Sequence, residues 1–181
     1  LISSTADTNQ SIEDSLIAIP GENTTAHLLF SMAYPQAKNK IFIRYDEIED
    51  FVLAKKGLGV IIHENRFTYE GKGLKKIIDL GDYWEQKTSN AIPLGGIVIK
   101  KELDTSIQQN IDALIKQSIA YGFSKYPALN DYIKCHAQEM SEQVMRQHID
   151  LYVNEYSLDL GEEGKKAILK LLENHPVQTT G

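Results

Sequence analysis

Short apolar runs alternate with helical patterns over the first hundred residues, and this alternation limits the fold more than any other feature of the sequence. Strands are predicted at Ser15 to Ile19, Ile41 to Tyr45, Val60 to Ile62, Lys75 to Leu80 and Ile97 to Lys100. Helices are predicted from Asn23 or Thr24 to Tyr34 and from Asp46 to Lys56, with a turn or short helix over Gly81 to Thr88. The alternation predicts an α/β fold, in which helices cover a mostly parallel sheet.

The remainder of the chain, after Lys101, has a helical pattern throughout. Four helical segments are predicted, at Asp104 to Tyr126, Leu129 to His136, Ser141 to Tyr156 and Glu162 to Leu172. We therefore expect an α/β lobe that carries the functional site over residues 1–101, a helical part over residues 102–176, and a loose tail over residues 177–181.

The composition argues against several classes of partner. The 181 residues carry a net charge of −6 and contain no run of Lys or Arg, so nucleic acid and anionic membranes are poor partner candidates. No apolar stretch approaches the roughly 18 residues that a spanning helix needs, and no signal peptide is visible. Cys135 is the only cysteine, which suits a reducing cytosol, and we expect a cytoplasmic protein.

The first candidate for chemistry is His63, which follows the apolar run GVII directly. Open α/β sheets bind their ligands at the carboxyl ends of the strands, which is where His63 is predicted to lie. An imidazole there can act as a general base. The alternative, which the residue pattern alone favours, is a structural or merely exposed histidine.

The second candidate is the segment GENTTA, which lies between a predicted strand and a predicted helix. The free backbone N–H groups of a helix start and the helix dipole bind anions or polyol oxygens, and Thr24 and Thr25 add hydroxyl groups. An ordinary helix cap is the alternative. Both candidates follow strands, so a parallel sheet would place them on the same edge. A third candidate is Gly95 in the turn PLGG, where a ligand could approach closely, or which is simply a turn.

Several familiar motifs are absent from the sequence. The run HENRF lacks the second histidine of a zinc-protease helix, and the glycines before Val60 precede a strand instead of following one, unlike a dinucleotide loop. Neither a P-loop nor a nucleophile-elbow motif occurs. Four further histidines are interpreted as surface or satisfied residues: His27, His136, His148 and His175.

Several separate motifs nevertheless occur in a recognisable order. These are IPGENTTAHLLF, then GVIIHENRFTYEGKGLKKIIDLGDYWEQKTSNAIPLGGI, then KCHAQEM and YVNEYSLDLGEEG. In this order they resemble the 1,4-dihydroxy-6-naphthoate synthase family of the futalosine route to menaquinone. The resemblance extends from Ser15 to Leu172.

The resemblance implies the two-lobed fold of type II periplasmic binding proteins, here the middle lobe with the C-terminal helices, which belong to or pack on the incomplete other lobe. It implies a lyase that binds cyclic dehypoxanthinylfutalosine between the lobes and fragments it into 1,4-dihydroxy-6-naphthoate and a dihydroxyacetone unit. The proton acceptor of the family maps onto His63, and its substrate-contacting Thr-Ala pair maps onto Thr25 and Ala26. No metal or organic cofactor is implied.

The family begins with a segment that builds much of the other lobe, and this segment is missing from the sequence. Because the chain starts with Leu1 in what resembles the end of a strand, we expect a fragment of a longer protein. We expect negligible turnover from the fragment alone, and either self-association into a homo-oligomer or disorder among its last three helices. A solute-binding or effector-sensing module of the same fold is the alternative function, although a base after the GVII strand favours an enzyme.

Overall fold

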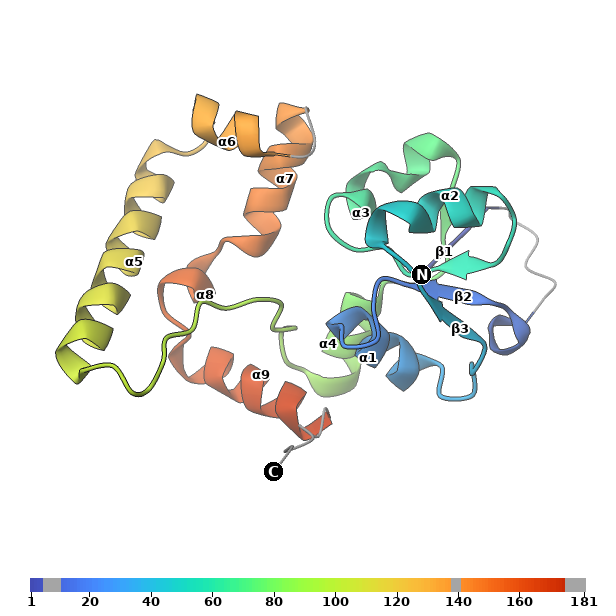
Figure 1. Cartoon of the computed structure of the whole chain (residues 1–181), viewed down its shortest axis with the longest axis horizontal. Helices are drawn as coiled ribbons and strands as arrows, with labels where there is room; N and C mark the ends of the chain where they lie inside the picture. The colour runs from blue at the N-terminus through green and yellow to red at the C-terminus, as the bar shows by residue number, and fades with distance from the viewer. Residues whose placement is uncertain (5–10, 138–140, 175–181) are drawn as a thin grey trace. The chain divides into compact units, whose positions relative to one another are not determined.

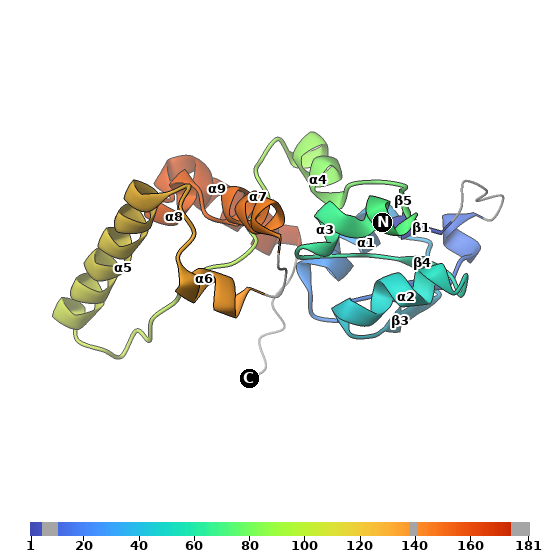
Figure 2. The same cartoon turned by 90° about the horizontal axis from the view of Figure 1, so that it is seen from above.

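The computed structural model describes residues 1–4, 11–137 and 141–174, and Figures 1 and 2 present it from two directions. The chain divides into two compact units. The first unit consists of Leu1–Ile92 with Leu169–Gly181, and the second of Pro93–Ile168. The predicted tail at residues 177–181 lies outside the described residues.

The first unit contains a five-stranded sheet in the order β3-β2-β4-β1-β5. The strands are β1 (Ile2–Ser3), β2 (Ile17–Ile19), β3 (Lys40–Phe42), β4 (Leu58–Gly59) and β5 (Lys75–Lys76). Strand β2 pairs in parallel with both β3 and β4, whereas β1 pairs antiparallel with β4 and β5. Four strands therefore run in one direction, and the predicted mostly parallel sheet is interrupted by β1.

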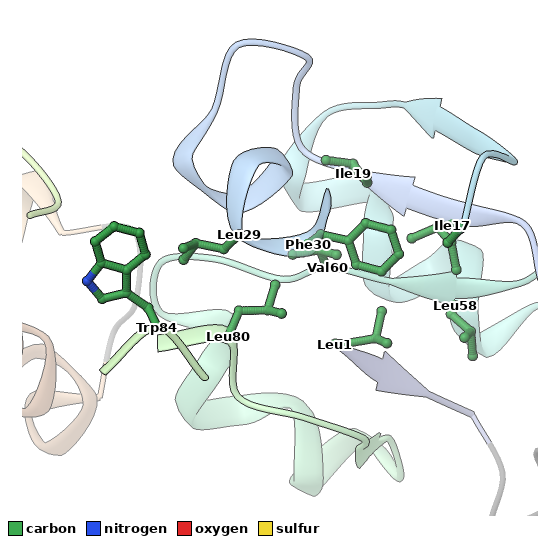
Figure 3. Close-up of a cluster of buried hydrophobic side chains, with 10 residues drawn as sticks. Leu1, Ile17, Ile19, Leu29, Phe30, Leu58, Val60, Leu80 and Trp84 are labelled. Carbon is green, nitrogen blue, oxygen red and sulfur yellow. The ribbon is translucent and has the colours of Figure 1, made fainter. Parts of the chain in front are cut away.

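Helices cover both faces of this sheet because β2 is apolar on both sides. The helices of the first unit are α1 (Thr25–Ala33), α2 (Ile48–Leu53), α3 (Asn65–Thr68) and α4 (Leu80–Thr88), with 3₁₀ turns η1 (Ile12–Asp14), η2 (Tyr45–Glu47) and η3 (Tyr69–Lys72). Ile17 and Ile19 belong to a buried cluster with Phe30 of α1 and Trp84 of α4 (Figure 3). Ala18 points to the opposite cluster, with the α2 residues Ile48 and Val52. The order of strands and helices confirms the predicted α/β class.

Three of the predicted strands differ from the structure. The strand predicted at Val60 to Ile62 lies earlier in the chain, as β4 (Leu58–Gly59), and residues 60–62 have no regular structure. The run after Lys76 does not continue as a strand, because the Asp79 carboxylate accepts hydrogen bonds from the N–H groups of Gly81 and Asp82 and so caps α4. The strand predicted at Ile97 to Lys100 is wrong. These residues have no regular structure, Val98 is 92% exposed, and no described strand pairs with them.

The second unit is helical, as predicted. It contains α5 (Thr105–Lys125), α6 (Asp131–His136), α7 (Glu142–Tyr152), α8 (Glu155–Leu158) and most of α9 (Gly161–Asn174). The helix predicted over Ser141 to Tyr156 is broken before α8, because the Asn154 side chain caps the N–H of Tyr156 and the Ser157 hydroxyl caps the N–H of Asn154. Among the described residues, no helix combines the length and apolar character needed to cross a membrane.

The end of α2 gives a prediction about stability. Lys55 is exposed and adopts φ +56°, a left-handed conformation that is strained for any residue with a Cβ. Replacing Lys55 with Gly is expected to raise the free energy of unfolding by about 0.5–1 kcal/mol, because the strain is removed. The matched control is Lys56→Gly, an exposed neighbour without positive φ, which is expected to be neutral or slightly destabilising. Urea unfolding of both variants tests this, and equal effects would contradict it.

Candidate functional site

His63 lies in the turn between β4 and α3, with its side chain exposed. Its backbone adopts φ +56°, which is uncommon for any residue other than glycine. The His63 carbonyl accepts a hydrogen bond of 3.3 Å from the N–H of Arg66, which closes the turn. Left-handed backbone of this kind is concentrated at functional sites, where the surrounding structure holds it in place. Lys55 and Ser89 adopt the same conformation, so it supports a function for His63 together with the position of His63 after β4.

The imidazole of His63 contacts the ring of Tyr45, with ring centroids 5.1 Å apart and an interplanar angle of 71°. Tyr45 begins η2, shortly after β3, whereas His63 follows β4. Since β3 and β4 flank β2, the ring contact joins the segments that follow the two neighbours of β2. The sequence interpretation missed Tyr45. The available signal was an aromatic residue at the end of a predicted strand, IFIRY, on the same edge as His63.

The chain leaving β2 forms the turn that begins α1, and the N-cap is Thr24, one of the two predicted helix starts, Asn23 and Thr24. The Thr24 hydroxyl accepts a hydrogen bond of 3.2 Å from the N–H of His27 and donates one of 2.7 Å to the carbonyl of Gly21. Both roles are structural, so Thr24 acts as an ordinary cap. The N–H groups of Thr25 and Ala26 lie in the first turn, where helices lack intrahelical acceptors. None of the described residues hydrogen-bonds the Thr25 side chain.

The parallel pairing of β2 with β4 places both candidates at one edge of the sheet. Ile17 pairs with Leu58 and Ala18 with Gly59 in register, so the chain leaves both strands on the same side. The start of α1 follows β2, and His63 follows β4. Hydrogen-bond donors from backbone N–H groups, a helix dipole and an imidazole therefore share this carboxyl edge, which is the usual position of ligands in such sheets.

His27 is also in α1, but both nitrogens of its ring already have polar contacts within the protein. Its Nδ1 lies 2.7 Å from the carbonyl oxygen of Glu22, and its Nε2 lies 3.2 Å from Nζ of Lys40. Lys40 also donates to the Ser31 hydroxyl, and its pKa is lowered, mainly by burial and further by the charge of Lys38. The interpretation of His27 as a satisfied histidine agrees with these contacts. Within the described ranges, no cluster of His, Cys, Asp and Glu residues could hold a metal ion.

Gly95, the third candidate, stays a prediction. It belongs to the second unit, in an exposed segment without regular structure, while His63, Thr24, Thr25 and Ala26 belong to the first. A Cβ added at Gly95 would meet no atom within 4 Å. Within the first unit, the candidate site consists of His63, Tyr45 and the start of α1.

Comparison with known proteins identifies relatives over nearly the whole chain. A family described as "Menaquinone biosynthesis" matches residues 1–175. A curated protein of Thermus thermophilus, 1,4-dihydroxy-6-naphtoate synthase, is 39% identical over 163 residues, which cover 90% of this chain and 60% of the relative. A protein of the same name from Streptomyces coelicolor is 36% identical over 174 residues, covering 93% of this chain and 62% of the relative.

A crystal structure of a protein from Archaeoglobus fulgidus is also similar, with a TM-score of 0.86 and 27% sequence identity. The match covers 96% of this chain and 64% of that protein. The chain thus spans about three fifths of the length of the curated relatives that it matches.

Proposed function

Because this chain belongs to the menaquinone biosynthesis family, we propose that it is the part of a 1,4-dihydroxy-6-naphthoate synthase that carries the catalytic base. The observation that carries the proposal is the left-handed turn that holds His63 against Tyr45 at the carboxyl edge of the sheet. A binding protein without chemistry has no need for a base held in this way.

The proposed reaction is the fragmentation of cyclic dehypoxanthinylfutalosine into 1,4-dihydroxy-6-naphthoate and a dihydroxyacetone unit, which makes the enzyme a lyase. His63 accepts a proton from a hydroxyl group on the sugar-derived part of the substrate. Electrons then move toward the bicyclic ring as carbon–carbon bonds break. The ring becomes aromatic, which supplies driving force, so one base and a few hydrogen-bond donors suffice for the reaction.

We further propose the fold of type II periplasmic binding proteins, with the substrate between this α/β lobe and a lobe completed by the rest of the full-length protein. The sheet order supports this assignment, since β1 runs opposite to the other strands and lies between β4 and β5. A lobe on the other side of the substrate would exclude water and hold the substrate against the carboxyl edge.

The start of α1 is the proposed site for a substrate oxygen, which the Thr25 side chain and the free N–H groups would hold. In the full-length protein, Thr25→Val is expected to raise KM about tenfold, because the variant loses a hydrogen bond but keeps the shape of the side chain. Its free energy of unfolding should change by less than about 0.5 kcal/mol. The matched control is Thr24→Ala, which removes the cap and should cost about 1 kcal/mol of stability. An unchanged KM for Thr25→Val would contradict the assignment.

The proposed activity is tested by incubating the full-length protein with cyclic dehypoxanthinylfutalosine and following the products by chromatography. The expected result is release of 1,4-dihydroxy-6-naphthoate with multiple turnovers. Calorimetry on the same sample measures substrate binding and so distinguishes an enzyme from the alternative, a protein that only binds the substrate. Tight binding of the substrate without conversion would overturn the enzyme assignment and favour a solute-binding or effector-sensing module.

A further inference from the structure

The carboxylate of Glu49 in α2 is buried, with a relative exposure of 3%. Its Oε2 accepts a hydrogen bond from Nδ2 of Asn65 and forms an ion pair with Nζ of Lys72, each at 2.5 Å. Its Oε1 is also buried and has no hydrogen-bond partner among the described residues. A buried carboxylate with an unsatisfied oxygen contributes little to stability, so its presence needs another explanation.

The position of Glu49 in the fold suggests why a buried carboxylate is present there. Asn65 is the first residue of α3, two positions after His63. Tyr45, whose ring contacts His63, begins η2, which continues directly into α2 and Glu49. The hydrogen bond from Asn65 to Glu49 therefore joins the same two segments whose rings meet at the candidate site. The second contact of the carboxylate, Lys72, lies at the end of η3 and reaches the same oxygen, Oε2, as Asn65 does.

We propose that Glu49 is a positioning residue for His63, acting through Asn65. The hydrogen bond holds the start of α3 against α2, and this fixes the left-handed turn that aims the imidazole toward the carboxyl edge of the sheet. Strained backbone persists only where neighbouring contacts hold it, and this contact is two residues from the strain. The proposal deepens the proposed function, on which its catalytic consequence rests. Glu49 itself is buried and does not act on the substrate.

The test uses Asn65→Ala in the full-length protein, which breaks the link but leaves the ion pair of Glu49 with Lys72. The first measurement is the NMR spectrum of the His63 ring protons, which the neighbouring Tyr45 ring shifts from their usual positions. These signals, assigned by their loss in His63→Gln, are expected to move toward the values of an unstructured histidine. The second measurement is turnover. Because small displacements of a catalytic group are costly, kcat is expected to fall about tenfold or more, with KM changing less than about threefold.

The matched control is Val52→Ala, which removes a buried side chain from the same helix without touching the polar contacts. It should lower the melting temperature at least as much as Asn65→Ala, while the His63 signals and kcat stay unchanged. A second variant, Glu49→Gln, retains an acceptor for Asn65 and should preserve the His63 signals better than Asn65→Ala does.

Two results would overturn the positioning role. These are unchanged His63 signals in Asn65→Ala, and equal shifts in Val52→Ala, which would indicate a general loss of structure. Failure of the proposed function has a different signature. If the His63 signals move in Asn65→Ala while both Asn65→Ala and His63→Ala keep normal turnover, the link between Glu49 and His63 stands and the role of His63 as a base is overturned.

Discussion

Replacing His63 with Ala in the full-length protein is expected to lower kcat by about a hundredfold or more, since a positioned general base typically contributes about 10² to 10⁴ in rate. The free energy of unfolding should change by about 1 kcal/mol or less, because the side chain is exposed and its described packing is the edge of Tyr45. Steady-state kinetics and urea unfolding on the same preparation measure both quantities.

Two further variants sharpen this test. His63→Gly removes the imidazole and also relieves the left-handed strain, so it should be as inactive as His63→Ala and at least as stable. The matched control is His136→Ala, which removes another exposed histidine that packs on a tyrosine ring, with centroids 4.5 Å apart, and should retain full turnover. A large loss of stability in His63→Ala, with normal specific activity of the folded fraction, would show that His63 is a packing residue.

The second large effect is expected from Gly57→Ala, which should reduce the free energy of unfolding by about 3 kcal/mol or more. A Cβ at this position would collide with the backbone carbonyl oxygen of Leu16, and it would lie 3.1 Å from Cε1 of Phe51. The same Leu16 oxygen accepts a hydrogen bond of 2.9 Å from the N–H of Leu58. The collision therefore falls on the pairing of β2 with β4, the two strands that lead to the candidate site.

Gly71→Ala is the control for this variant. Gly71 lies in η3, and a Cβ added there would meet no atom within 4 Å. Its unfolding free energy should stay within about 0.5 kcal/mol of the unsubstituted protein. Chemical unfolding followed by circular dichroism compares the two variants, and a Gly57→Ala protein as stable as Gly71→Ala would contradict the close approach of these strands.

Features that depend on local chemistry could be predicted from the sequence. The alternation of apolar runs and helical patterns predicted the α/β class, and the N-cap of α1, Thr24, was one of the two residues predicted to begin that helix. Each of these features depends on neighbouring residues, because a helix cap or the period of a strand involves only a few consecutive positions of the chain. The recognised order of motifs, which the comparisons confirmed as the family, extended this to the chain as a whole.

Features that depend on contacts between distant segments could not be predicted. The antiparallel position of β1 between β4 and β5 can be predicted only if the neighbouring strands are known. The apolar run at Ile97 has the pattern of a strand whether or not a partner strand exists. The ring contact of Tyr45 joins residues 18 positions apart, and the hydrogen bond of Glu49 joins residues 16 positions apart. No periodicity in the sequence indicates such pairs, so the contacts around His63 could be identified only from the structure.

The central claim is that His63 and the start of α1 face one ligand at the carboxyl edge of the sheet. The most direct measurement is a crystal structure of the full-length protein with 1,4-dihydroxy-6-naphthoate bound. We expect an oxygen of the ligand within hydrogen-bond distance of the Thr25 or Ala26 N–H, the His63 imidazole against the same molecule, and Thr25 and His63 within about 10 Å of each other, a helix diameter. A ligand bound elsewhere, or Thr25 and His63 farther apart than this, would contradict the claim.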